Sequence, residues 1–183
     1  MTLIDRDEMW SRDSARHRLG VPLDVRLAYV QLGAGRINDI DSDVRQVVDA
    51  LLAHEDIHVV LGESLLGDRL EINMDRVHVI RDYPNALFYN AFDVSVQAGG
   101  YNSFHEMRLQ GIPTLFLPNM NTGMDDQLSR CIIAGQEGWG IIHNNKSDIE
   151  ESIMKLVQHQ SLIEKFESNG SEVLAEYLFE DVK

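Results

Sequence analysis

The chain has 183 residues, which is the length of one domain with a sizeable core of its own. Apolar residues make up 44% of the sequence and charged residues 25%, ordinary globular values that exclude a disordered or collagen-like chain. Thirty acidic residues against 16 basic ones give a formal net charge of −14, which disfavours nucleic acid and anionic membrane surfaces as partners.

Short apolar runs alternate with helical patterns along most of the chain. A charged segment from Asp5 to Leu19, closed by Gly20, predicts a short leading helix. Apolar runs then predict buried strands at 25–32, 57–61, 76–80, 91–96, 113–117 and 138–142. Helical patterns predict helices at 41–54, 103–110, 125–136, 147–158 and 162–177. Ser147 and Glu150 have the spacing of a capping box at the start of the fourth of these helices.

This alternation is typical of an α/β fold, a Rossmann-like doubly wound parallel sheet of about six strands. We expect one domain over residues 1–183, with a leading helix at 1–20, the core at 25–160 and a C-terminal helix at 161–183. Ligands of such sheets bind outside the carboxyl ends of the strands. The loops at 33–38, 81–84, 97–102 and 118–126 follow those ends, so the site is predicted there.

The loop after the first strand reads Gly-Ala-Gly-Arg-Ile-Asn from Gly33 to Asn38. It has the first two glycines of a dinucleotide fingerprint and asparagine in place of the third. Small residues before a helix N-terminus let a phosphate approach the backbone, which makes Gly33, Gly35 and Arg36 a possible phosphate loop. A plain tight turn explains the same residues equally well.

Residues His54 to His58 match the letters of the HExxH zinc-protease motif. That chemistry needs both histidines on one helix face, whereas here the helical pattern ends near His54 and a strand begins at Ile57. A chance match is the better explanation. The chain has one cysteine, Cys131, and no Cys/His cluster with zinc-site spacing, so no metal and no disulfide framework are expected.

Two glycines, Gly99 and Gly100, follow the fourth predicted strand, and a helix begins near Ser103. Unpaired N–H groups and the positive end of a helix dipole beside a loop without bulky side chains form a phosphate cradle. Glu106 lies one turn inside that helix, where a carboxylate can accept both hydroxyls of a ribose. Ser103 and Glu106 also fit a capping box, and taken alone the capping box is the better explanation of these two residues.

The wider pattern resembles the donor-binding signature of glycosyltransferases with the GT-B fold. It consists of Tyr83-Pro84, Gly100-Tyr101-Asn102-Ser103, Glu106, Gly111, Pro113, Pro118 and Asp126-Gln127. The pattern is similar to the plant secondary-product signature and to the C-terminal half of the bacterial peptidoglycan N-acetylglucosaminyltransferase. The resemblance implies one half of a GT-B fold, the C-terminal half that binds the donor.

The resemblance also assigns roles to individual residues. It implies that the nucleobase lies at Arg81, Asp82 and Tyr83, the diphosphate at Gly99, Gly100, Asn102 and Ser103, the ribose at Glu106, and the donor sugar at Asp126 and Gln127. Asp126 and Gln127 also stand where a helix begins, so helix capping is an alternative for them. Ala98 stands where the family has a phosphate-contacting histidine, so backbone N–H groups must hold more of the phosphate.

The implied function is the UDP-sugar-binding domain of a glycosyltransferase that transfers a hexosyl group. The acceptor would be held by an N-terminal half or a partner subunit, and the leading helix favours a domain excised from a larger enzyme. We therefore expect no catalytic residue in this chain, no transfer by the chain alone and no cofactor. A sugar-nucleotide epimerase of the same architecture and a non-catalytic nucleotide-binding module stay open as alternatives. The polar start of the chain and the lack of a membrane-length apolar run predict a cytoplasmic location.

Overall fold

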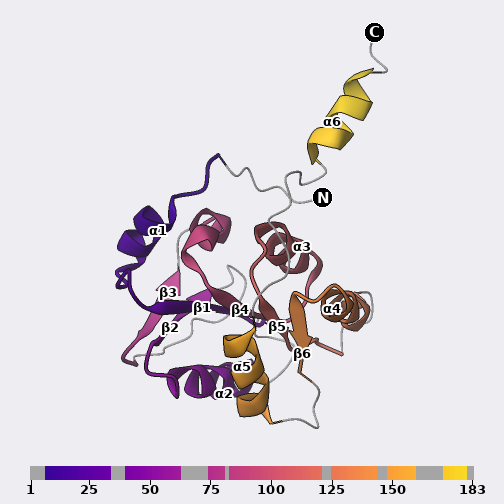
Figure 1. The fold of residues 1–183 in the computed structure, drawn as a ribbon. Helices are drawn as coiled ribbons and strands as arrows, with labels where there is room; N and C mark the ends of the chain where they lie inside the picture. The colour runs from indigo at the N-terminus through magenta and orange to yellow at the C-terminus, as the bar shows by residue number, and fades with distance from the viewer. Residues whose placement is uncertain are drawn as a thin grey trace.

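The six strands form one parallel sheet in the order β3-β2-β1-β4-β5-β6 (Figure 1). The computed structural model describes residues 7–33, 40–62, 74–80, 83–120, 125–143, 148–159 and 171–180. Within them the strands are β1 (Arg26–Gln31), β2 (Ile57–Gly62), β3 (Val77–Ile80), β4 (Val94–Gln97), β5 (Thr114–Phe116) and β6 (Gly140–Ile142). Every neighbouring pair is parallel. The predicted Rossmann-like α/β fold is confirmed.

Helices cover both faces of the sheet, as Figure 1 shows. They are α1 (Arg12–Leu19), α2 (Ile40–Leu52), the 3₁₀ helix η1 (Asn85–Ala91), α3 (Tyr101–Gln110), α4 (Gln127–Gln136) and α5 (Ile149–Gln158). A further helix, α6 (Ser171–Glu180), covers neither face in Figure 1. One core cluster joins α1, η1, α3 and α4 to the first face, and a second joins α2 and α5 to the other. Because strand side chains alternate, Tyr29 of β1 faces the first cluster and Val30 the second.

Arg16 fastens α1 to the sheet. Its side chain is fully buried, and its guanidinium donates to the carbonyl oxygens of Ala91, Leu23 and Val25 at 2.8–3.1 Å. It also forms an ion pair of 2.8 Å with the Asp93 carboxylate, which accepts from the Leu27 N–H as well. Each of the three guanidinium nitrogens therefore donates to an acceptor, as the desolvation of a buried charge requires.

The structure differs from the sequence prediction at several helix ends. The leading helix begins only at Arg12, because the Ser11 hydroxyl caps it by accepting from the Ser14 N–H. Asp148, not Ser147, caps α5, since its side chain accepts from the Glu150 N–H at 3.1 Å; Ser147 itself lies outside the described residues. Of the last predicted helix, 162–177, the part before residue 171 is likewise outside them.

The 3₁₀ helix η1 was not predicted. The expected strand at 91–96 starts later, at Val94, because the preceding residues form a turn that buries Phe88 and Tyr89 in the first core cluster. The HExxH match is confirmed as chance, since α2 ends at Leu52 and His58 lies in β2. No helix in the described part of the chain is both long enough and apolar enough to cross a membrane.

Candidate functional site

A pocket of about 580 Å³ opens at the carboxyl ends of β1 and β4. The chain runs from β1 outward through β2 to β3 and then returns to place β4 beside β1. The strand order therefore reverses between β1 and β4, which is the point where open α/β sheets bind ligands. The volume lies within the usual range of small-molecule sites. The described residues that line the pocket are Gln31, Gly33, Tyr83, Pro84, Asn85, Ala86, Tyr89, Ala98, Gly100, Tyr101, Asn102, Ser103, Glu106 and Gln127.

The loop between β4 and α3 brings a helix N-terminus to this pocket. Gly100 is the N-cap of α3, and no side chain caps the helix there. The positive end of the helix dipole therefore faces the pocket without a neutralising side chain. Gly99 has φ +84°, and a Cβ at this position would come within 2.6 Å of Cys131 Sγ, so the loop requires glycine. From α4, the Arg130 guanidinium donates to the Gly99 carbonyl at 3.2 Å and pairs with Asp125.

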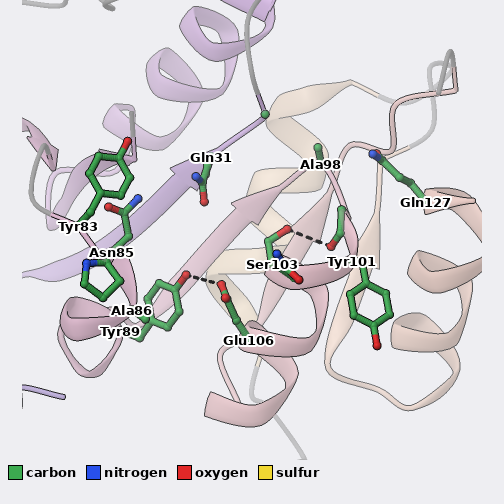
Figure 2. A pocket seen from close by; sticks show the side chains of 14 residues that line it. Gln31, Tyr83, Asn85, Ala86, Tyr89, Ala98, Tyr101, Ser103, Glu106 and Gln127 are labelled. Carbon is green, nitrogen blue, oxygen red and sulfur yellow. Dashed lines mark hydrogen bonds between the residues drawn. The ribbon is translucent and has the colours of Figure 1, made fainter. Parts of the chain in front are cut away.

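Ser103 and Glu106 do not form a capping box. The helix starts at Tyr101, so Ser103 is its third residue and Glu106 its sixth, beyond the first turn. The Ser103 hydroxyl donates to the Gly100 carbonyl at 3.2 Å, whereas Glu106 Oε2 accepts the Tyr89 hydroxyl at 2.6 Å (Figure 2). The capping alternative is wrong for this pair, and Glu106 has its carboxylate at the pocket wall instead.

Among the described residues that line the pocket, Glu106 is the one with a charged side chain. Burial raises the pKa of Glu106, and the Tyr89 hydroxyl opposes that rise by stabilising the carboxylate. No lysine or arginine belongs to the described lining, so an anion here would be held by backbone N–H groups and the α3 dipole. A carboxylate at one end and a helix N-terminus at the other suit a ligand with hydroxyls and an anionic group.

The comparisons with known proteins fit this arrangement. No family model matches the chain. Over 122 residues the chain is 30% identical to the UDP-N-acetylglucosamine--N-acetylmuramyl-(pentapeptide) pyrophosphoryl-undecaprenol N-acetylglucosamine transferase of Salinibacter ruber (strain DSM 13855 / M31). The match covers 63% of this chain and 32% of that protein.

Solved structures of glycosyltransferases have the same fold. The glycotransferase of kitacinnamycin superposes with a TM-score of 0.62 at 20% identity, over 86% of this chain and 39% of that one. For a calicheamicin glycosyltransferase the TM-score is 0.61 at 17% identity, over 86% and 37%. For the spinosyn rhamnosyltransferase, in a complex with thymidine diphosphate, it is 0.59 at 20% identity, over 73% and 37%. The chain has the fold of a GT-B glycosyltransferase domain. It spans less than two fifths of the length of each of these proteins.

The pocket gathers most of the predicted residues that the structure describes. Those that line it are Gly33, Tyr83, Gly100, Asn102, Ser103, Glu106 and Gln127, whereas Gly99 lies behind it against Cys131. Four predicted residues lie outside the described part of the chain: Gly35, Arg36, Arg81 and Asp82.

Asp126 and Gln127 have different positions at the start of α4. Asp126 caps the helix and is exposed, and its carboxylate accepts from both the N–H and the hydroxyl of Ser129, which lower its pKa. Gln127 is 8% exposed and lines the pocket, with its side-chain oxygen accepting from the Asn119 N–H at 2.9 Å. The capping alternative therefore describes Asp126, and its contact with a donor sugar stays a prediction.

Three polar residues of the lining were missed from the sequence: Gln31, Asn85 and Tyr89. The buried Tyr29 hydroxyl donates to Gln31 Oε1 at 2.9 Å and accepts from Asn85 Nδ2 at 3.1 Å. Gln31 ends β1 next to the pocket after the apolar run from Leu27 to Val30, and that polar interruption was an available signal. Asn85 and Tyr89 gave no comparable signal, because their positions depend on η1.

Two buried acceptors near this network have no hydrogen-bond partner among the described residues, Asn85 Oδ1 and Gln97 Oε1. Gln97 of β4 lies in register with Gln31 of β1. Within the described residues, no group of three or more His, Cys, Asp or Glu side chains has the arrangement to hold a metal ion.

Proposed function

We propose that this chain is the donor-binding domain of a glycosyltransferase and binds a UDP-sugar in the pocket between β1 and β4. One observation carries the proposal: the uncapped N-terminus of α3 and the Glu106 carboxylate line the same pocket. The first suits a diphosphate, and the second suits the hydroxyls of a ribose. A pocket of about 580 Å³ is of the size that a nucleotide-sugar needs.

In this proposal the diphosphate lies against the backbone of Gly100, Asn102 and Ser103. The positive end of α3 then stabilises the charge that develops on the leaving diphosphate during transfer, without a metal ion. The ribose hydroxyls donate to Glu106, the base lies beside Tyr83, and the sugar lies toward Gln127. The hexosyl acceptor is held by an N-terminal half or a partner subunit, and the chain works in the cytoplasm.

The relatives support a nucleoside diphosphate as ligand. The Salinibacter relative is named for UDP-N-acetylglucosamine, and the spinosyn rhamnosyltransferase binds thymidine diphosphate. Uridine has a 2′-hydroxyl and thymidine does not. A carboxylate beside the ribose can accept from both the 2′- and the 3′-hydroxyl of uridine but only from the 3′-hydroxyl of thymidine, so Glu106 favours uridine.

Calorimetry and thermal unfolding with UDP, thymidine diphosphate, ADP and NAD test the proposal. A ligand present at about a hundred times its Kd adds roughly 2.7 kcal/mol to the free energy of unfolding, and we expect this for UDP but not for NAD. Glu106→Gln should weaken UDP binding by about 1.5–3 kcal/mol, because a charge-assisted hydrogen bond is lost. Glu137→Gln is the matched control, since Glu137 pairs with Arg108 away from the pocket. A folded chain that binds no nucleoside diphosphate at millimolar concentration would refute the proposal.

Transfer requires more than this domain. General-base assistance and orientation of the acceptor each contribute orders of magnitude to the rate, and the proposal assigns neither to this chain. We expect the chain alone to bind donor and transfer nothing, and an added acceptor-binding half to restore transfer. Sustained transfer by residues 1–183 alone, abolished by Glu106→Ala, would contradict the proposal that another half or subunit is needed for transfer.

A further inference from the structure

A buried tyrosine stands directly behind the carboxylate of Glu106. Tyr89 is 4% exposed and donates its hydroxyl to Glu106 Oε2 at 2.6 Å, as Figure 2 shows. Its ring packs beside those of Tyr29 and Phe92, with centroids 5.8 and 6.4 Å away. Neighbours on the core side therefore fix the ring of Tyr89, and with it the position of the hydroxyl.

We propose that Tyr89 is a positioning residue that holds Glu106 for the ribose, occupying Oε2 and leaving Oε1 to accept hydroxyls of the ligand. The inference rests on the proposed function and adds a residue to it. An ionised carboxylate accepts through both oxygens, and a side chain with several rotatable bonds loses entropy when a ligand orders it. Tyr89 orders the carboxylate before the ligand arrives, so Glu106 loses less side-chain entropy when the ligand binds.

The surroundings of Glu106 make this hydrogen bond important. Among the described residues, the titratable groups that face it are Tyr89 from η1 and Tyr29 from β1, and burial raises the pKa of both phenols, so both are neutral at physiological pH. Glu106 is itself half-buried, which disfavours its charge, and the Tyr89 hydroxyl favours it. Tyr89 therefore both orients the carboxylate and favours its ionised form.

Tyr89→Phe tests the inference, because it removes the hydroxyl and keeps the ring. In the free protein, carbon-13 NMR titration of the Glu106 carboxyl should show a higher pKa in the variant. In calorimetry, the affinity for UDP should fall by about tenfold, while that for 2′-deoxyuridine diphosphate should fall less, so their ratio moves toward one. The loss of UDP affinity on acidification should also begin at a higher pH, since the carboxylate is protonated sooner.

Tyr177→Phe is the control for removing a tyrosine hydroxyl, because Tyr177 lies on α6, is 70% exposed and does not line the pocket. It should leave the Glu106 titration and the ratio of the two nucleotides unchanged. Should Tyr89→Phe fail to fold, Glu106→Asp serves instead, since it keeps the charge but withdraws it from the Tyr89 hydroxyl. Glu106→Asp should also move the ratio of the affinities for UDP and 2′-deoxyuridine diphosphate toward one.

Two results would overturn the inference alone. One is a Tyr89→Phe variant with the wild-type Glu106 titration and wild-type ratio of UDP to 2′-deoxyuridine diphosphate. The other is an equal loss for both nucleotides with an unchanged pH profile, which is what a merely structural tyrosine produces. A wild-type chain that binds neither nucleotide refutes the proposed function and this inference together.

Discussion

Replacing Gly99 with alanine tests the loop that brings α3 to the pocket. The residue has φ +84°, a conformation that costs a side-chain-bearing residue about 1–3 kcal/mol. The added Cβ would also come within 2.6 Å of Cys131 Sγ, and overpacking of a well-packed core costs about 1–3 kcal/mol. We therefore expect Gly99→Ala to lower the free energy of unfolding by about 2–6 kcal/mol, a large share of the 5–15 kcal/mol typical of a domain.

Urea unfolding followed by far-ultraviolet circular dichroism measures this loss. Adding Cys131→Ala should recover the part due to the close contact but not the part due to φ, so the two changes should couple in a double-mutant cycle. Gly100→Ala is the control: φ is −59° and the nearest atom, Ser103 Oγ, is 3.7 Å away, so the loss should stay below about 1 kcal/mol. A Gly99→Ala variant as stable as the wild type, or no coupling to Cys131, would refute the reasoning.

Three further predictions concern charge and polarity in the core. Burial raises the pKa of Glu106 in the folded state, so the charged carboxylate destabilises the fold at pH values above the ordinary pKa of glutamate. Glu106→Gln should therefore raise Tm at pH 8 and leave it unchanged below about pH 4. A lower Tm of the variant at pH 8 would contradict this. Arg16→Met leaves the carbonyls of Ala91, Leu23 and Val25 without the Arg16 donor, whereas Asp93 keeps Arg12 and the Leu27 N–H. The variant should lose about 3–5 kcal/mol in urea unfolding, and a loss below about 1 kcal/mol would contradict the role of Arg16 in holding α1. Gln97→Met removes a buried oxygen that has no partner among the described residues, together with the bond from Gln97 Nε2 to Ser95, so stability should change by no more than about 1 kcal/mol. A loss above about 2 kcal/mol would mean that Gln97 Oε1 has a partner.

Much of the fold could be predicted because strands that are buried on both faces appear in the sequence as short apolar runs. Arg26–Gln31 and Ile57–Gly62 are near-continuous apolar runs, and such runs alternating with helical patterns permit little besides a parallel sheet. The 3₁₀ helix η1 could not be predicted, since its seven residues are too short for a helical period. What holds it is packing of Phe88 and Tyr89 against residues distant in sequence.

The pocket residues could be predicted where the backbone of a loop determines their position. They could not be predicted where the position depends on contacts between side chains of different helices and strands. Paired glycines at 99 and 100 indicate a loop that approaches a ligand, and in the structure Gly100 lines the pocket with Gly99 behind it against Cys131. The ambiguity of Ser103 and Glu106 depended on where α3 begins, and a start two residues earlier decided against capping. The bond from Tyr89 to Glu106 joins residues 17 positions apart on two elements, and no local pattern encodes it.

The central position of β1 has a consequence for how the domain is made. Its partner on one side, β2, follows about one helix later, but its partner on the other side, β4, pairs Ala28 with Val94 across 66 positions of chain. Contacts of such long sequence separation form late and slow folding. During synthesis from the N-terminus, the β4-facing edge of β1 stays unpaired until β4 has left the ribosome. An apolar strand edge in that state is open to pairing with other chains, so the domain is at greatest risk of aggregation in the interval before its ligand pocket can exist.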